Sequence, residues 1–118
     1  MSATARTTAA SRGPVNRIEV QTFRLVRPYR AELFAAASRE LDAVARNLAV
    51  QLRGRVTSRA TTEVAGRDAR AYRIDFGERV DEITFVLDGR REYQLLCRRP
   101  AAADGATCKA FVKSFRLD

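Results

Sequence analysis

Hydrophobic residues along this chain change their spacing near residue 31 and again near residue 54. Between residues 31 and 53 they recur at three- and four-residue steps, with charged residues mainly on the other side, which is typical of an amphipathic helix. Gly54 follows directly, and glycine commonly ends helices. The stripe consists of Phe34, Ala37, Leu41, Val44, Ala45, Leu48 and Leu52. We therefore predict one long helix over 31–53 whose apolar stripe another element has to cover.

The segment before this helix, residues 15–27, has the two-residue alternation of a strand. The alternation slips by one position between Val20 and Phe23. Such a slip indicates either a strand with a β-bulge or an extended run that is buried on both faces.

After Gly54 the pattern predicts four strands separated by turns. The strands are expected at 56–64, at 69–76, around Ile83, Phe85 and Leu87, and around Tyr93, Leu95 and Cys97. Turns are expected at 65–68, at 77–79 and at Asp88-Gly89, which favours a two-residue type I′ turn. Pro100 ends the last strand. Thr107 can then cap a final helix with apolar positions at Cys108, Phe111, Val112 and Phe115.

The predicted order is therefore β-α-β-β-β-β-α. Because consecutive strands are joined by short turns, the sheet should be mainly antiparallel, and the two helices should cover it. This is an α+β fold of the α/β/α sandwich type. We expect one domain over 15–118, preceded by a disordered tail or linker over 1–14, which is small, polar and free of acidic residues.

The net charge of +8 is concentrated at the two ends of the chain. Residues 1–30 carry +5 and residues 97–118 carry +3, whereas 31–96 are neutral. A nucleic-acid-binding protein usually carries its basic residues along one face, so a neutral body argues against that class without excluding it. Contact of the ends with phosphate or an anionic surface stays open. No stretch approaches the ~20 apolar residues that span a membrane, and residues 1–14 lack the apolar stretch of a secretory signal.

Cys97 and Cys108 are the only cysteines. Both fall on positions that the periodicity turns inward, one on the last strand and one on the final helix. This favours a disulfide, which would indicate an oxidising compartment. The alternative is two reduced cysteines that serve as small apolar residues.

Enzyme chemistry finds little support in this composition. The chain has no histidine, which excludes Ser-His and Cys-His pairs and leaves two cysteines with too few partners for zinc. Its glycines form no phosphate-binding loop. Asp75, Glu78, Asp81 and Glu82 alternate with arginines and favour a charge-balanced surface. We therefore expect no catalytic residue, no metal site and no cofactor.

Arginines at the ends of the first and last predicted strands are the best candidate for an interaction surface. If these two strand ends are neighbours, the side chains form one basic patch, to which Tyr29 and Tyr93 could add aromatic contacts. The residues concerned are Arg24, Arg27, Arg30, Arg98 and Arg99.

Two segments resemble PsbP-like proteins, a group that includes photosystem II extrinsic proteins and actinobacterial LpqN-type lipoproteins. One is the run from Thr61 to Tyr72, and the other is Tyr93–Cys97 followed by Cys108 and the Phe111–Phe115 helix. The resemblance implies an α/β/α sandwich around an antiparallel sheet, a non-catalytic binding or assembly role and a place outside the cytoplasm. It transfers no site residues.

The favoured hypothesis is thus a non-enzymatic domain that contacts a protein partner or a membrane surface. It would be extracytoplasmic or membrane-associated if a leader has been removed, and cytoplasmic otherwise. The alternative is a cytoplasmic basic module that binds nucleic acid or an acidic protein through its arginine-rich ends. A small-ligand carrier with a pocket between sheet and helix is a third hypothesis.

Overall fold

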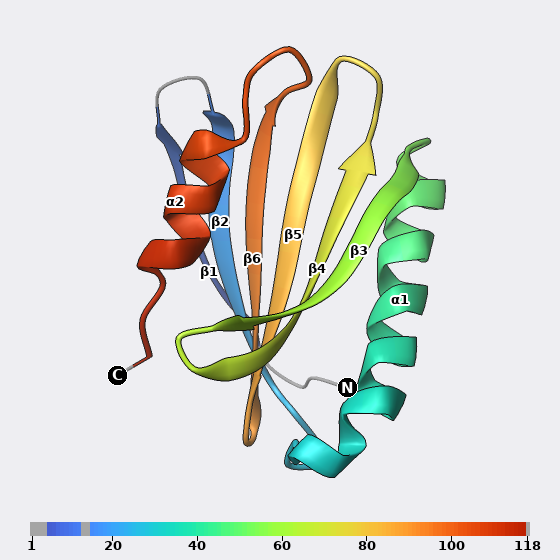
Figure 1. The fold of residues 1–118 in the computed structure, drawn as a ribbon, viewed down its shortest axis with the longest axis vertical. Coiled ribbons are helices and arrows are strands. Elements are labelled where there is room, and N and C mark those ends of the chain that lie inside the picture. The colour runs from blue at the N-terminus through green and yellow to red at the C-terminus, as the bar shows by residue number, and fades with distance from the viewer. Residues whose placement is uncertain (1–4, 13–14, 118) are drawn as a thin grey trace.

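The computed structural model describes residues 5–12 and 15–117, and the side chains of 17–117. A single sheet lies between two helices (Figure 1). From residue 15 onward the elements follow the predicted order, which confirms the α+β class. In chain order they are β1 (Ala5–Arg12), β2 (Val15–Arg24), a 3-10 turn η1 (Ala31–Leu33), α1 (Phe34–Gln51), β3 (Arg55–Val64), β4 (Arg67–Asp75), β5 (Arg79–Asp88), β6 (Arg91–Pro100) and α2 (Ala106–Ser114).

The sheet has six strands in the order β1-β2-β6-β5-β4-β3, and every neighbouring pair is antiparallel. The strand before α1 therefore pairs with the last strand of the chain. In this pairing Arg17 lies opposite Arg98, and Arg24 lies opposite Arg91. The end of β2 is thus next to the beginning of β6.

Strand β1 corrects the expectation that residues 1–14 have no regular structure. Ala5–Arg12 pairs with β2 and forms one edge of the sheet. Its sequence, ARTTAASR, has no alternation of large apolar residues, so hydrophobic periodicity could not reveal a strand whose pairing comes from backbone hydrogen bonds. The rest of that segment, 1–4 and 13–14, lies outside the described residues.

Strand β2 has no bulge where the alternation slips. Its register against β6 runs without a shift from Arg17 to Arg24. Ile18 faces α2 and packs against the cysteines, whereas the buried Leu25, just after the strand, lines a cavity beside α1. The slip therefore reflects burial on one face of the segment at Ile18 and on the other face at Leu25. This agrees with the second predicted alternative, an extended run that is buried on both faces.

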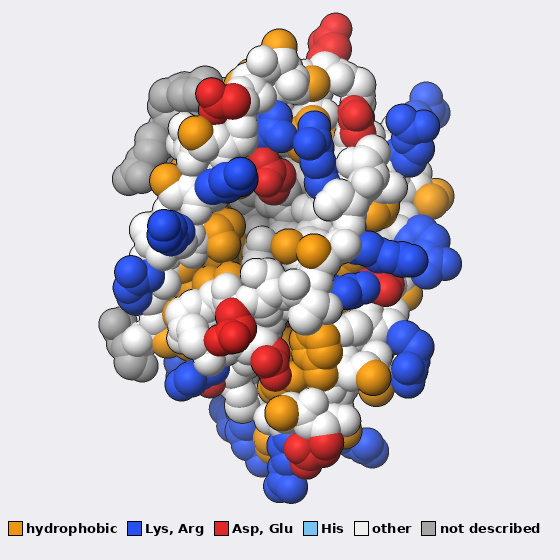
Figure 2. Space-filling model, in the orientation of Figure 1, with side chains coloured by type: hydrophobic (Ala, Val, Ile, Leu, Met, Phe, Trp, Pro, Cys, Tyr) orange, Lys and Arg blue, Asp and Glu red, His pale blue; other side chains and the backbone are white. Residues whose placement is uncertain are grey.

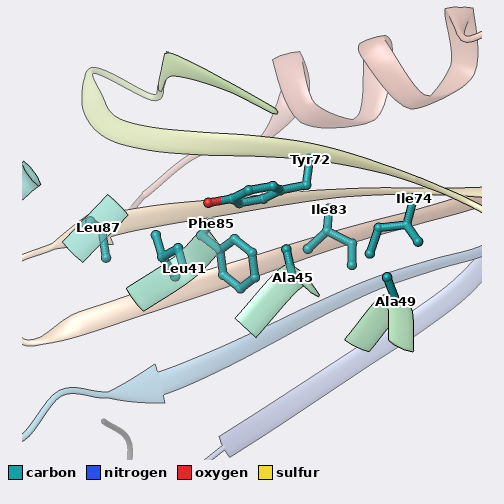
Figure 3. Close-up of a cluster of buried hydrophobic side chains, with 8 residues drawn as sticks. All are labelled: Leu41, Ala45, Ala49, Tyr72, Ile74, Ile83, Phe85 and Leu87. Carbon is teal, nitrogen blue, oxygen red and sulfur yellow. The ribbon is translucent and has the colours of Figure 1, made fainter. Parts of the chain in front are cut away.

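The larger core lies between α1 and the sheet. Leu41, Ala45 and Ala49 recur on one side of α1 and are almost fully buried. The two alanines let the helix lie close to the strands. The opposing side chains come from β4 and β5, and Figure 3 shows them converging on the helix: Tyr72, Ile74, Ile83, Phe85 and Leu87.

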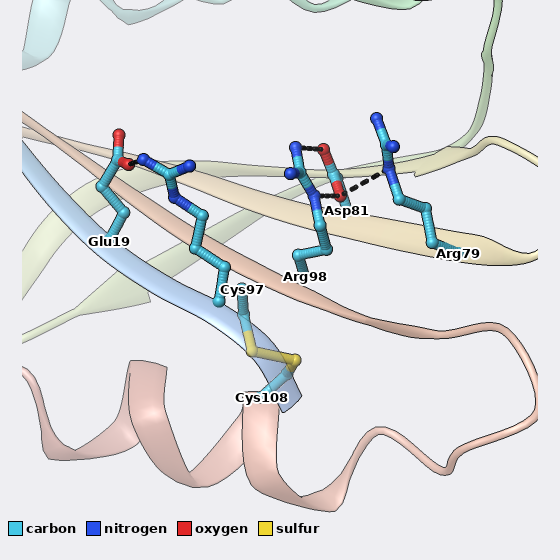
Figure 4. A network of polar contacts seen from close by, with 7 residues as sticks. Glu19, Arg79, Asp81, Cys97, Arg98 and Cys108 are labelled. Carbon is cyan, nitrogen blue, oxygen red and sulfur yellow. Dashed lines mark hydrogen bonds and ion pairs between the residues drawn. A yellow bond between two sulfur atoms is a disulfide. The ribbon is translucent and has the colours of Figure 1, made fainter. Parts of the chain in front are cut away.

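The smaller core lies on the opposite face, under α2. Successive strand residues point to opposite faces, so Val86 and Leu95 contact Phe111, Val112 and Phe115. A disulfide joins Cys97 of β6 to Cys108 of α2, with their Cα atoms 5.6 Å apart (Figure 4). This confirms the predicted disulfide.

Details of the predicted caps and turns differ. Helix α2 begins after Gly105, and Thr107 does not cap it; the Ala106 N–H instead donates to Asp104 Oδ1 at 3.0 Å. The β5–β6 turn has Gly89 and Arg90 at its centre, and only Gly89 has a positive φ, of 57°. That is the requirement of a type II′ turn and not of type I′.

Candidate binding site

The five arginines proposed as one basic patch lie at two opposite ends of the sheet. Because β2 and β6 are antiparallel, Arg24 lies opposite Arg91, while Arg98 lies opposite Arg17. Arg27 and Arg30 follow Arg24 in the β2–α1 loop. The prediction of a single patch is therefore wrong. It required the ends of β2 and β6 to be neighbours, and the antiparallel pairing of these strands places their ends apart.

One end of the sheet carries Arg98 and Arg99 together with Asp81 and Glu82, and we call it the paired end. Arg98 donates Nε to Asp81 Oδ1 at 2.8 Å and Nη2 to Oδ2 at 3.1 Å, as Figure 4 shows. Arg99 is only 5% exposed; it donates to Glu82 at 2.8 Å and to the Ala103 carbonyl at 2.8 Å. These arginines hold β5, β6 and the β6–α2 loop together and present little free charge.

The other end of the sheet carries arginines of a different kind, and we call it the basic end: Arg24, Arg27, Arg30, Arg90 and Arg91. All five are exposed, and none lies within ion-pair distance of a described carboxylate. Figure 2 shows Lys and Arg side chains gathered at the lower end of the molecule. Arg90 and Arg91 were not among the predicted residues, although they follow the Gly89 turn directly, because only the pairing of β2 with β6 brings them beside Arg24.

A cavity of about 450 Å³ opens at the basic end, between the β2–α1 loop, the start of α1 and the sheet. We call it the α1 cavity. Its apolar lining includes Leu25, Leu41 and Leu87, which are buried, and Val26 and Leu33, which are 73% and 43% exposed. A volume of this size is within the range of ligand pockets, and exposed apolar side chains beside one indicate a binding surface.

The β2–α1 loop that forms one wall of this cavity is fixed to the β5–β6 turn. The Leu25 N–H donates to the Arg90 carbonyl and the Tyr29 N–H donates to the Gly89 carbonyl, each at 2.6 Å. The Tyr29 hydroxyl donates to Asp68 at 2.6 Å, and burial together with that carboxylate raises the Tyr29 pKa. The cavity wall is therefore held in place by backbone and side-chain contacts.

Glu92 also lines the α1 cavity and is its most unusual residue. The side chain is 2% exposed, and its Oε1 has no hydrogen-bond partner among the residues whose side chains are described. Burial, with a contribution from the Glu40 carboxylate, raises the pKa of Glu92 to about 7. Buried carboxyl groups are normally paired, so an isolated one in a cavity is a candidate functional group.

A partly buried carboxylate, Asp42 on α1, has the partners that Glu92 lacks. The Tyr72 hydroxyl donates to it, and Arg70 donates Nε and Nη2 to its two oxygens at 3.2 and 3.3 Å. Burial alone would raise the pKa of Asp42, but these hydrogen bonds and the charges of Arg70 and Arg59 lower it. Burial and Asp42 in turn raise the Tyr72 pKa to about 12. This network fixes α1 to β4 and has no free ligand-binding group.

Two further cavities are lined by no buried polar side-chain atom that lacks a described partner, although Arg46 and Arg55 of the first are exposed and form no described ion pair. One, of about 490 Å³, lies beside β3 and the end of α1 and includes Asp42. The other, of about 240 Å³, includes Arg17, Glu19, Asp81 and Arg98, which form ion pairs with one another. The α1 cavity is therefore the best candidate site.

Two general features concern the described part of the chain. Among residues 17–117 no group of three or more Cys, Asp or Glu side chains is placed to hold a metal ion. No described helix is both long enough and apolar enough to cross a membrane.

Comparison with known proteins gives a similarity of fold. No protein-family model matches the sequence, and no curated protein matches it either. Among solved structures, the chain is similar to PA94 from Pseudomonas aeruginosa, described as a protein of unknown function and a candidate regulator. The TM-score is 0.56 at 14% identity, over 98% of this chain and 83% of that one. At this identity the likeness shows the fold alone.

Proposed function

We propose that this chain is a non-catalytic protein-binding domain and that the α1 cavity receives apolar side chains from a segment of the partner. One observation carries the proposal: an apolar cavity opens at the basic end, where Val26 and Leu33 remain exposed. Burial of such side chains stabilises an interface by about 25 cal/mol for each Å² of apolar surface removed from water.

The surroundings of the cavity support a partner segment with acidic residues. Arginine is common at protein interfaces, and the five arginines of the basic end can attract carboxylates that flank the apolar residues. The fixed β2–α1 loop favours binding because a wall that is already ordered loses little entropy when the partner arrives.

The disulfide supports an extracytoplasmic location for this function. Disulfides persist in oxidising compartments and are rare in the cytosol. The resemblance to PsbP-like proteins points to the same location and to a binding or assembly role, and the antiparallel sheet between two helices is consistent with it.

Selection from a library of random dodecapeptides displayed on phage tests the proposal. Ala36 is exposed and lines the cavity, so Ala36→Trp should obstruct it; Ala43 is exposed on the same helix away from the cavity, so Ala43→Trp is the matched control. We expect enriched peptides to lose about tenfold or more in affinity for A36W and to bind A43W as they bind the wild type. Enriched peptides that bind A36W unchanged, or no enrichment at all, would contradict the proposal.

The exposed arginines of the basic end favour a second candidate function, the binding of nucleic acid. This function predicts binding to duplex DNA that weakens steeply with salt, because bound phosphates release counterions. Replacing Arg90 and Arg91 by alanine should reduce both the affinity and the salt dependence. The absence of binding at low salt would end this candidate.

A further inference from the structure

We propose that Glu92 makes the α1 cavity selective for a lysine side chain of the partner segment, whose ammonium group pairs with the buried carboxylate. This inference rests on the proposed function and specifies the chemistry of the bound segment. Three observations carry it: the position of Glu92, its lack of a described partner and the apolar walls around it.

The position of Glu92 places its carboxyl group at the sheet side of the cavity. Glu92 lies in β6 opposite Phe23 of β2 and Leu87 of β5. Leu87 belongs to the core under α1, so Glu92 faces the same side of the sheet. The β2–α1 loop and the start of α1 complete the cavity above it.

A buried carboxylate needs hydrogen-bond donors, and a cationic donor gives the strongest pairing. Oε1 has no described donor within reach, and Glu92 is only 2% exposed. The buried walls from Leu25, Leu41 and Leu87 are aliphatic. A lysine side chain matches both features, since its four methylenes can lie along apolar walls while its ammonium reaches the carboxylate.

The charges that line the cavity favour a cation over an anion. Glu40 of α1 adds a second carboxylate, and the one described cation in the lining is Arg27, which is exposed. The arginines of the basic end are exposed to solvent, where charges are screened beyond about 8 Å at physiological salt. They act on the flanks of a bound segment, whereas the buried Glu92 acts inside the cavity.

Lysine replacement in the selected peptides provides the first test. In peptides whose binding A36W abolishes, each lysine is replaced by norleucine, which keeps the aliphatic stem and removes the ammonium. We expect one lysine whose replacement weakens binding to the wild type at least tenfold and binding to Glu92→Gln less than about threefold. Arginine at that position should restore only part of the affinity, because its planar group is larger and suits two acceptors.

Several outcomes separate this inference from the proposed function. Peptides that bind at the cavity without any lysine dependence, or with the same dependence in E92Q, overturn the inference and leave the proposed function standing. Peptides that bind A36W as tightly as the wild type overturn both the inference and the proposed function. An affinity that rises from pH 6 to pH 8 in the wild type and stays level in E92Q supports the inference, since the carboxylate has to be ionised.

A small probe tests the carboxylate without any peptide. n-Butylammonium should shift the methyl NMR signals of Leu25 and Leu87 in the wild type and not in E92Q, whereas n-butanol should leave them unchanged. Glu40→Gln should weaken the amine only about twofold, because Glu40 is exposed. Equal shifts with amine and alcohol, or unchanged amine binding to E92Q, contradict the inference. Butylammonium that binds as tightly as the peptides would identify a free amine as the ligand and overturn the partner lysine.

Discussion

The two ends of the β5–β6 hairpin use similar residues in opposite ways. At the paired end, Asp81 is 3% exposed and lies between Arg98, at 2.8 Å, and Arg79, at 3.9 Å. At the basic end, Glu92 is 2% exposed and has no described partner for Oε1, while Arg90 and Arg91 point into solvent. At the paired end the buried carboxylate and the arginines form ion pairs, whereas at the basic end the buried carboxylate and the exposed arginines form no described ion pair.

This difference indicates which end has a structural role and which end is available for binding. A buried carboxylate with two arginines has its desolvation offset by hydrogen bonds and opposite charge. Glu92 receives no such compensation from the described side chains, so its burial destabilises the fold wherever it is ionised. A group that opposes folding and lies in an open cavity is better explained by binding than by stability.

Removing Asp81 should produce the largest effect of the four changes that test this comparison. Asp81→Ala leaves Arg98 and Arg79 without their shared partner, and loss of one member of a buried ion pair destabilises a protein by about 4 kcal/mol. Urea unfolding measures the change. Glu78→Ala, an exposed acid in the neighbouring turn, is the control and should change stability by less than about 0.5 kcal/mol. If D81A also changes the free energy of unfolding by less than about 0.5 kcal/mol, the paired end contributes no net stability.

Glu92 should make stability fall as the pH rises. Its folded pKa of about 7 lies above the ordinary value of 4.5, so the folded state holds the proton more tightly than the unfolded state. The resulting penalty is absent below pH 4.5, grows between pH 4.5 and 7, and reaches about 3 kcal/mol above pH 7. Glu92→Gln removes the ionisation. The difference in unfolding free energy between E92Q and the wild type should follow this curve, and a difference that does not change with pH would contradict it.

The sequence was sufficient where a local pattern determines the structure. The three- and four-residue spacing predicted α1, and Leu41 and Ala45 of the predicted stripe are buried against the sheet. The end of the stripe was wrong, because the helix stops at Gln51 and Leu52 is 51% exposed, while the buried Ala49 was not part of it. The disulfide could be predicted because Cys97 and Cys108 are the only cysteines and both fall on inward positions.

The candidate site depended on contacts that no local pattern contains. Glu92 and Gln94 alternate with Tyr93 and Leu95, so they would be expected to face solvent. The β2–α1 loop and α1 cover Glu92, and that covering follows from the pairing of the first predicted strand with the last. The same pairing separated Arg24 from Arg98. Strand β1 could not be predicted because backbone pairing with β2, and not a buried apolar face, defines it.

Reducing the disulfide should destabilise the α2 face of the sheet, which lies opposite the α1 cavity. The bond links residues 11 apart, and the loss of this constraint on the unfolded chain corresponds to about 2.8 kcal/mol. Urea unfolding with and without reductant measures the change, and the double variant C97S/C108S should not respond to reductant. Because α2 lies on the face opposite α1, butylammonium binding should be retained in the reduced protein. Loss of binding on reduction would show that the two faces are coupled.

The smallest change in stability should come from arginines of the basic end. Arg90→Ala and Arg91→Ala remove exposed charges with no described ion-pair partner, so the free energy of unfolding should change by less than about 0.5 kcal/mol. Arg98→Ala is the matched control from the other end and should destabilise by several times as much, because it leaves Asp81 buried beside a more distant arginine. The same R90A/R91A variant should bind acidic cavity peptides more slowly at low salt, since these charges attract carboxylates over a distance. If R90A/R91A unfolds as easily as R98A, the basic end also stabilises the fold, and the contrast between the two ends no longer holds.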